Sequence, residues 1–424
     1  MAGGQTPGGT RPHSVTNNKK GGGDMEMEPN QTPGGAKLTR LSALKRRRRL
    51  RRLRTVALAL VVLAALALYA SGIFGRGLAL LSDMVESARI GLQPGGGWPV
   101  KTGIAEPLQV ESLGGGFVEL GSQDLVFFSA RGAQLRSVAH NYARPCISSG
   151  KTRFVLYNRA GYELRVESRT RTLYTNTYTQ PILLAEMASN GTVAVVTDSS
   201  RYLAEVTVYD STFQPIYQWY PSDSEGVPGQ IAFSQNGKRF AAACLSAANG
   251  QLAVKIHLLD LNSGTIGLTI DAGSSPVLQM HWLSNTKLLV VFQNRIAVFD
   301  TTTGEQLATY SYPSGTLLSV SVSQRAIGVL IGSEMADAPV RLILLDTNCQ
   351  ELGTASVPAP ASKVVCTRSG AYVLRGDCVA AYDLEGEYLW EMSTDSQPQA
   401  VLNAKNLLVF SGGQAALVTQ PAEE

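Results

Sequence analysis

The 424-residue sequence predicts an all-β fold, a β-propeller, with a single transmembrane helix before it. Three observations lead to this prediction. Near the N-terminus, twenty uncharged residues follow a strongly basic segment. After residue 105, short runs of β-branched and aromatic residues alternate with Gly, Asn, Asp and Ser, which is typical of strands and turns. Within this region, a strand that ends in Asp or Asn and is followed by a turn occurs six times.

Residues 1–44 are predicted to form a disordered cytoplasmic tail. They are rich in Gly, Pro, Thr and Asn and contain few large apolar side chains, and QTPGG occurs twice, at Gln5–Gly9 and Gln31–Gly35. Such a segment cannot bury enough apolar surface to offset the entropy lost on ordering.

Residues 45–54 and 55–74 predict a juxtamembrane basic segment and an uncleaved transmembrane helix. Eight of the ten residues from Lys45 to Arg54 are Lys or Arg, and the twenty residues from Thr55 to Phe74 carry no charge. At about 1.5 Å per residue, such a helix spans roughly the 30 Å of a bilayer core. The basic side favours a cytoplasmic N-terminus and contact with anionic lipid headgroups. A cleaved signal peptide is the alternative, but its apolar region would be shorter and nearer the N-terminus.

The charge balance argues against nucleic acid as a partner. Residues 1–54 contain 13 Lys and Arg against 3 Asp and Glu, whereas the remainder contains 24 against 30. The excess positive charge therefore belongs to the N-terminal segment, and the large domain is mildly acidic. A nucleic-acid-binding domain would carry the opposite balance.

Residues 75–105 are predicted to be a membrane-proximal helix and linker. Apolar residues recur at helical spacing at Leu78, Leu81, Val85 and Ala88, and GLQPGGGWPV then ends the helix. Trp98 in this linker either lies at the bilayer interface or packs against the following domain.

Residues 106–421 are predicted to be an extracytoplasmic β-propeller. The repeated Asn or Asp stands at positions 158, 210, 260, 300, 346 and 383, with gaps of 52, 50, 40, 46 and 37 residues. A period near 40–45 residues with about four strands per unit is typical of propellers, whose sheets cover one another's faces in a closed ring. We interpret the repeated Asp as scaffolding, because a carboxylate at a strand end accepts backbone N–H groups of the turn.

The spacing favours eight blades that begin near residues 106, 145, 181, 227, 275, 315, 361 and 397. Seven blades result if the shortest terminal units merge. After KNLLVFSGGQAAL (405–417) too little chain remains for a final outer strand. We therefore expect an N-terminal segment, Glu106–Glu111, to supply that strand and close the ring.

Two resemblances follow from these repeats. VFDTTTGEQLATY and AAYDLEGEYLW are similar to the repeats of quinoprotein-like and WD40-like propellers. The basic tail, single span, GGGWPV, RFVLYNRAGYEL and NGTVAVVTDSSRYLAEVTVYD resemble a group of uncharacterised membrane-anchored propeller proteins of Gram-positive, clostridia-type bacteria. The resemblance implies an architecture and a location, and no established chemistry.

We find no motif for catalysis, a cofactor or a metal. The four histidines, His13, His140, His257 and His281, form no HExxH or HxH, and no GxSxG, P-loop, GxGxxG or calcium loop is present. Glycosidase chemistry needs two placed carboxylates, and the sequence singles out no pair. The five cysteines lack a CxxC and are predicted to be buried free thiols.

The best candidate for a partner-binding surface is the aromatic cluster in IYQWYPSD, with Tyr217, Trp219 and Tyr220. Exposed aromatic side chains often anchor partners. The alternative is that these rings fill the gaps between blades.

Together these features predict a single-pass protein of the bacterial cell membrane. Its propeller would be a non-catalytic binding or scaffolding module for an envelope protein or polymer. One alternative is a hydrolase or redox enzyme with its active site at the central channel. Another is a sensor that signals through the basic tail. Fold alone does not decide between them.

Overall fold

The computed structural model describes residues 55–57, 59, 60, 62, 63, 73–90, 95–248, 250–333, 335 and 338–421. Within these residues, no helix is both long and apolar enough to cross a membrane. The predicted tail, the basic segment and most of the predicted span Thr55–Phe74 lie outside them.

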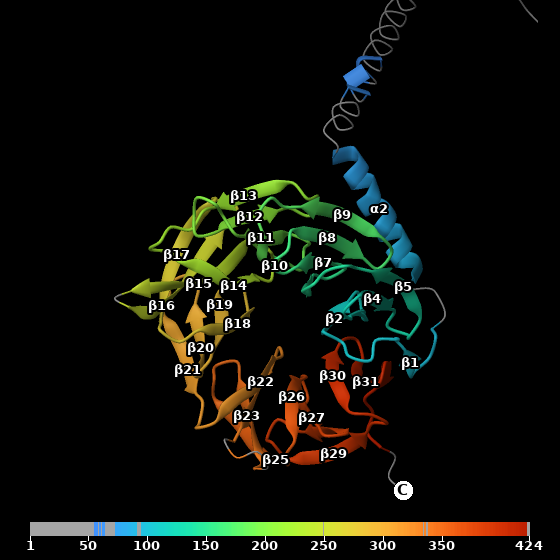
Figure 1. The fold of residues 1–424 in the computed structure, drawn as a ribbon, viewed down its shortest axis with the longest axis vertical. Coiled ribbons are helices and arrows are strands. Elements are labelled where there is room, and N and C mark those ends of the chain that lie inside the picture. The colour runs from blue at the N-terminus through green and yellow to red at the C-terminus, as the bar shows by residue number, and fades with distance from the viewer. Residues whose placement is uncertain are drawn as a thin grey trace, which may run out of the picture. The chain divides into compact units, whose positions relative to one another are not determined.

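Eight four-stranded antiparallel sheets form a ring, and the region around the ring axis is here called the channel (Figure 1). In each sheet the strand positions are here called A to D from the centre outward. Blade 1 consists of β2 (Gln109–Leu113), β3 (Gly116–Leu120), β4 (Asp124–Phe128) and β5 (Gln134–Ala139). Blade 2 consists of β6 (Pro145–Ser149), β7 (Arg153–Asn158), β8 (Glu163–Ser168) and β9 (Thr172–Thr177). Blade 3 consists of β10 (Ile182–Met187), β11 (Val193–Thr197), β12 (Glu205–Tyr209) and β13 (Pro215–Trp219).

Blade 4 consists of β14 (Val227–Phe233), β15 (Arg239–Ala248), β16 (Gln251–Asp260) and β17 (Thr265–Gly273). Blade 5 consists of β18 (Val277–Trp282), β19 (Lys287–Phe292), β20 (Arg295–Asp300) and β21 (Gln306–Ser311). Blade 6 consists of β22 (Thr316–Val322), β23 (Ala326–Gly332), β24 (Val340–Asp346) and β25 (Glu351–Val357). Blade 7 consists of β26 (Ala361–Cys366), β27 (Ala371–Arg375), β28 (Cys378–Tyr382) and β29 (Tyr388–Ser393). Blade 8 consists of β30 (Pro398–Asn403), β31 (Leu407–Ser411), β32 (Gln414–Leu417) and β1 (Val100–Lys101).

The prediction of eight blades is confirmed. The first strands begin at residues 109, 145, 182, 227, 277, 316, 361 and 398, within three residues of the predicted starts. The spacing of the repeat therefore located each blade.

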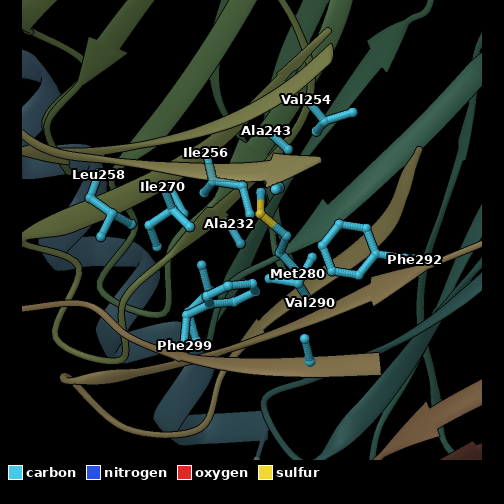
Figure 2. Close-up of a cluster of buried hydrophobic side chains, with 14 of the residues drawn as sticks. Ala232, Ala243, Val254, Ile256, Leu258, Ile270, Met280, Val290, Phe292 and Phe299 are labelled. Atoms are coloured by element: carbon cyan, nitrogen blue, oxygen red, sulfur yellow. The ribbon is translucent and has the colours of Figure 1, made fainter. Parts of the chain in front are cut away.

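The core lies between neighbouring blades. The B and C strands are apolar on both faces because a neighbouring blade covers each face, and β11 and β28 are buried throughout. The D strands have one face toward solvent, so β21 alternates between exposed and half-buried residues. Figure 2 shows one such interface, where Ile256 and Ile270 of blade 4 pack against Met280 and Phe299 of blade 5. Each blade is thus stabilised mainly by its neighbours.

The repeated aspartates cap the turns between the C and D strands. Asp210 accepts hydrogen bonds from the backbone N–H groups of Thr212 (2.8 Å) and Gln214 (3.0 Å). Asp346 accepts the equivalent pair from Asn348 and Gln350, each at 2.8 Å. Asp260, Asp300 and Asp383 also accept backbone N–H groups of their turns. The predicted scaffolding role is confirmed at these five positions.

Asn158 does not cap a turn between C and D strands, so the prediction that it is equivalent to the five aspartates was wrong. It ends β7, a B strand, and so lies at a turn between the B and C strands. In blades 1 and 2 the position of the aspartate is occupied by Ser129 and Ser168. Ser129 Oγ accepts the N–H groups of Arg131 (3.3 Å) and Ala133 (3.1 Å). A hydroxyl thus replaces the carboxylate in these two turns.

An N-terminal strand closes the ring, as predicted, but the predicted segment was wrong. Glu106–Glu111 does not complete blade 8, because Gln109–Leu113 forms the A strand of blade 1. The outer strand of blade 8 is β1, whose Val100 and Lys101 pair with Ala415 and Gln414.

The preceding glycines let the chain approach β1 past blade 1. A Cβ on Gly96 would lie 2.5 Å from the carbonyl oxygen of Gly132, and Gly97 has φ +82°. Trp98 then packs against Phe117 of blade 1, with ring centroids 6.3 Å apart. This agrees with the predicted alternative in which Trp98 contacts the domain.

Before β1 lies the helix α2 (Ile73–Ile90), at the position where a helix was predicted. Four apolar residues at helical spacing were predicted for this helix. Two of them do not pack against the propeller, since Val85 is 65% exposed and Ala88 is also exposed. The contact is formed instead by polar side chains and Leu80, described below.

Candidate functional site

A polar pocket of about 800 Å³ opens where the turns between A and B strands of blades 4–8 surround the channel. This side of the ring, which also carries the turns between C and D strands, is called here the AB face. The pocket is lined by Gln235, His281, Trp282, Leu283, Ser284, Lys287, Ser321, Val322, Ser323, Gln324, Thr347, Val365, Cys366, Arg368, Asn403 and Ala404. Its volume lies within the usual range for ligand sites.

Side-chain bonds between adjacent blades hold the pocket wall. Gln235 of blade 4 donates to the carbonyl oxygen of Leu283 at 2.9 Å. The Ser321 hydroxyl of blade 6 accepts the N–H group of Cys366 at 2.9 Å. Asn403 of blade 8 donates to the carbonyl oxygen of the same cysteine at 3.4 Å. Because these bonds join the innermost strands and turns, the wall is a rigid part of the ring.

The charge of the pocket lining is positive. Lys287 and Arg368 contribute the ionised groups, and no Asp or Glu is among the lining residues. Within the described part of the chain, neither side chain forms an ion pair. Burial lowers the pKa of His281, so this imidazole is neutral near pH 7, and burial raises the pKa of the Cys366 thiol to about 12.

Two neighbours modify this charge. Asp300 lies opposite Lys287 in the β19–β20 ladder, and the two side chains form no ion pair among the described residues. The carboxylate of Asp300 instead accepts N–H groups of its own turn. Hydrogen bonds from Thr302, then from the backbone of the turn, and the charge of Lys287 lower the pKa of Asp300. Arg239 adds a further cation beside the pocket, with its guanidinium 5.4 Å from the centre of the Trp282 ring.

The opposite side of the channel carries acidic groups. Glu111 in β2 and Glu186 in β10 are half-buried residues of the A strands of blades 1 and 3. The pKa of each carboxyl is raised to about 7, mainly by burial. For Glu186 this value includes a hydrogen bond with Ser148, which lowers the pKa, and the charge of Glu111, which raises it. Among the described residues, no group of three His, Cys, Asp or Glu side chains is placed to hold a metal ion.

The predicted aromatic cluster does not form one exposed surface. Trp219 is only 7% exposed, and its Nε1 donates to Glu225 at 3.3 Å. Tyr217 is half-buried against Phe240, with ring centroids 6.4 Å apart. Tyr220 alone is exposed, at 41%, and lies beside Tyr202 with ring centroids 4.8 Å apart.

The other sequence candidates have packing roles. His257 is bound between Thr269 (2.9 Å) and the carbonyl oxygen of Glu225 (3.2 Å). His140 is buried against the carbonyl oxygen of Gly121. All five cysteines are free, and four are buried while Cys146 is half-buried. Cys366 and Cys378 lie on β26 and β28, with β27 between them.

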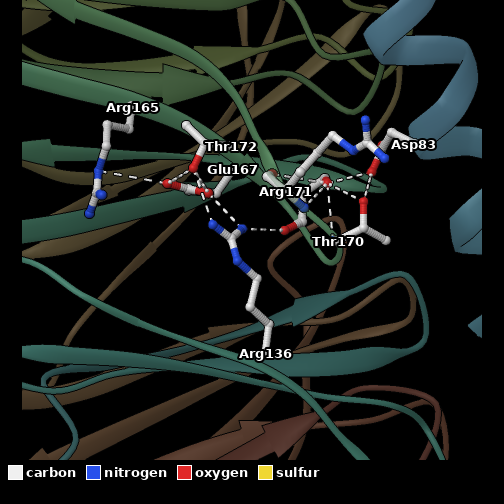
Figure 3. Close-up of polar contacts among 8 residues, drawn as sticks. Asp83, Arg136, Arg165, Glu167, Thr170, Arg171 and Thr172 are labelled. Atoms are coloured by element: carbon white, nitrogen blue, oxygen red, sulfur yellow. Dashed lines mark hydrogen bonds and ion pairs between the residues drawn. The ribbon is translucent and has the colours of Figure 1, made fainter.

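A second polar cluster joins α2 to blade 2 (Figure 3). The buried Asp83 accepts hydrogen bonds from the hydroxyls of Ser168 and Thr170, the latter at 2.5 Å. Arg171 forms an ion pair with Glu86 at 2.5 Å and donates to Ser82 at 2.8 Å. The carboxylate of Asp83 on α2 therefore contacts Ser168, the residue that caps the C–D turn of blade 2.

Beneath this cluster, the buried Glu167 joins blades 1 and 2. It pairs with Arg136 at 2.8 Å and lies 3.6 Å from Arg165. Because Arg136 lies on β5 and Glu167 on β8, this ion pair links the two blades, and loss of Arg136 would remove the nearest cation from a buried carboxylate.

The fold and the polar channel mouth define the class of protein, an eight-bladed β-propeller with a pocket on one face. The chain belongs to a family of unknown function (DUF5711), whose profile matches residues 100–416. A comparison with curated proteins found no match.

Many solved structures share the fold. The computationally designed Ika8 protein is 12% identical, with a TM-score of 0.57, and the match covers 75% of this chain and 99% of that protein. BamB from Moraxella catarrhalis is 13% identical, with a TM-score of 0.47 and 73% and 96% covered. The Cps50 (Swd1) propeller domain of Myceliophteria thermophila is 11% identical, with a TM-score of 0.46 and 66% and 95% covered. At these identities the similarity concerns the fold alone.

Sequence reasoning missed the pocket cations, Lys287 and Arg368. They stand 81 positions apart on turns of different blades. Each lies within a short unit of turn and strand, LSNTKLLVVFQ or RSGAYVLRGD, where the A strand connects to the B strand. Placing these units on a ring would have brought both turns to the same face.

Proposed function

We propose that this protein is a membrane-anchored, non-catalytic propeller that binds a partner at the pocket on its AB face. The observation that carries the proposal is the 800 Å³ pocket with a rigid polar wall built by five consecutive blades. The anchor is proposed from the twenty uncharged residues Thr55–Phe74 after the basic segment Lys45–Arg54. On this proposal the N-terminus is cytoplasmic, the propeller faces the cell envelope, and the partner is an envelope protein or polymer.

Proximity labelling in intact cells tests the proposal. A labelling enzyme fused to the C-terminus is compared in the wild type and in Gln324→Trp, which places a large side chain in the pocket. The matched control is Arg159→Trp, an exposed position at the turn between β7 and β8 on the other face. Labelled proteins lost in Gln324→Trp and retained in Arg159→Trp would support binding at the pocket. Equal labelling in all three would exclude that surface.

A second candidate is a hydrolase, which the pair of channel carboxyls favours. Glu111 and Glu186 lie on the A strands of blades 1 and 3, and the charge of one affects the pKa of the other. Acid–base hydrolysis of glycosidic bonds uses two carboxyl groups, one of them with a raised pKa. The test is turnover of envelope glycans by the full-length chain and by Glu111→Gln and Glu186→Gln. Turnover that both variants abolish would replace the binding proposal.

A further inference from the structure

We propose that the pocket on the AB face binds an acidic, extended segment of a protein partner through the side chains of Lys287 and Arg368. This inference rests on the proposed binding function and names the chemistry of the ligand. Within the described residues Lys287 and Arg368 form no ion pair, and the lining of the pocket that they share contains no carboxylate.

The two cations have donors available for a ligand. Nε and Nη2 of Arg368 donate to the amide oxygen of Gln324, which positions the guanidinium, and Nη1 forms no hydrogen bond within the described residues. The backbone N–H group of Lys287 is held by Ser284 at 3.1 Å, which fixes the start of β19 beside the pocket. The Lys287 ammonium and the Arg368 guanidinium can bind carboxylates by charge-assisted hydrogen bonds.

The distribution of charge around the channel favours the same ligand. Glu111 and Glu186 occupy blades 1 and 3, whereas the cations occupy blades 5 and 7. Because the pKa of each of these carboxyls is about 7, they are only partly ionised at neutral pH, whereas Lys287 and Arg368 are charged and attract an anionic segment to their side. Complementary charge of this type determines orientation and partner selection.

The neutral part of the lining favours a peptide over a sugar polymer. One polar atom of each amide, Gln235 Oε1, Gln324 Nε2 and Asn403 Oδ1, forms no hydrogen bond within the described residues and can pair with an extended backbone. The aromatic ring in the lining, Trp282, is 8% exposed and lies beneath Arg239. A stacking platform for sugar rings is therefore not presented by the described lining.

Fluorescence anisotropy of the full-length protein in detergent tests the inference. The probe is a fluorescein-labelled hexaglutamate peptide, and hexaglutamine of the same length is the uncharged comparison. We expect binding of hexaglutamate alone, weakened about fivefold to tenfold by Lys287→Gln or by Arg368→Gln, and weakened by added salt. Arg368→Lys keeps the charge and should retain most of the affinity. Arg159→Gln removes an exposed cation on the other face and should have no effect.

Three results would overturn the inference. Equal binding by the wild type and by Lys287→Gln combined with Arg368→Gln would show that these cations do not hold the ligand. Equal binding of hexaglutamine would show that charge is irrelevant. Binding of inorganic phosphate or polygalacturonate but not of hexaglutamate would assign the pocket to another anion. If Gln324→Trp abolishes partner labelling in cells while any of these results holds, the binding function stands and the acidic ligand is wrong.

Discussion

Asp83 supplies blade 2 with the turn carboxylate that the blade itself lacks, and its removal should release α2. Five other blades cap the C–D turn with their own aspartate, whereas blade 2 has Ser168, whose hydroxyl donates to Asp83 of the helix. The Ser168 Oγ also accepts the N–H groups of Thr170 and Arg171, each at 3.2 Å. The helix and the turn therefore share one hydrogen-bond network.

Asp83→Ala removes two hydrogen bonds to a buried carboxylate. Each such bond contributes about 1.5–3 kcal/mol, and partial rehydration of the freed hydroxyls leaves a net loss of about 2–4 kcal/mol. At about 1.4 kcal/mol per factor of ten, the undocked population of α2 should rise about 30-fold to 700-fold. An undocked helix of 18 residues is marginally stable in water, so its amides should exchange faster.

Hydrogen–deuterium exchange of peptides covering residues 73–90 measures this effect. Ser168→Asp provides an independent test, because a second carboxylate beside Asp83 repels it by about 4 kcal/mol at 4 Å and an effective dielectric constant of 20. Combining Asp83→Ala with Ser168→Asp should keep the helix undocked while the turn regains its own cap. Ser129→Asp is the matched control, since it makes the same change in blade 1. The reasoning is refuted if Asp83→Ala leaves the exchange of α2 unchanged, or if Ser129→Asp accelerates it as much as Ser168→Asp.

Three further predictions concern the ring itself. Gly353→Ala should lower the free energy of unfolding in urea by about 1–3 kcal/mol, since its Cβ would lie 1.9 Å from the carbonyl oxygen of Glu385. Gly267→Ala, also on an outer strand, would meet its nearest atom at 3.6 Å and should cost far less, so equal losses would contradict the steric argument. Burial raises the pKa of Glu186 from 4.5 to about 7, so the folded state holds this proton more tightly, and stability present below pH 4.5 is lost as the pH rises through about 7. Glu186→Gln should therefore raise Tm relative to the wild type at pH 8 and not at pH 4; an equal effect at both would refute this. Iodoacetamide should label all five cysteines in denaturant without reductant, and fewer than five by mass spectrometry would reveal a disulfide.

The repeated blades could be predicted because their signal is local. The B and C strands are continuous apolar runs, and each C strand of blades 3–7 ends at or just before its turn Asp. Asn158 misled the assignment because RFVLYN also ends an apolar run in a polar turn residue, although that strand is a B strand. The closing strand was misplaced because β1 has two residues, too few to show a periodicity.

The candidate site was harder to predict because closure of the ring assembles it. Lys287 and Arg368 belong to separate turns, and only the ring brings those turns to one pocket. The aromatic cluster shows the same limit, because the sequence left open whether its rings are exposed or fill the gaps between blades. Blade 4 covers Trp219, so the second alternative holds for this residue. Local patterns therefore indicated which residues form strands and did not indicate what the next blade covers.

The position of α2 determines where mechanical load enters the ring. β1 is joined to β32 through two residue pairs, which makes it the shortest ladder in the propeller. A force that pulls on the chain upstream of residue 73 reaches α2 first, where Asp83 and Arg171 transfer it to blade 2. We expect the tension to reach β1 only after this helix has detached, and then to separate β1 from β32. The docked helix therefore protects the short β1–β32 ladder from load. A tethered propeller with an undocked α2 should open at lower force.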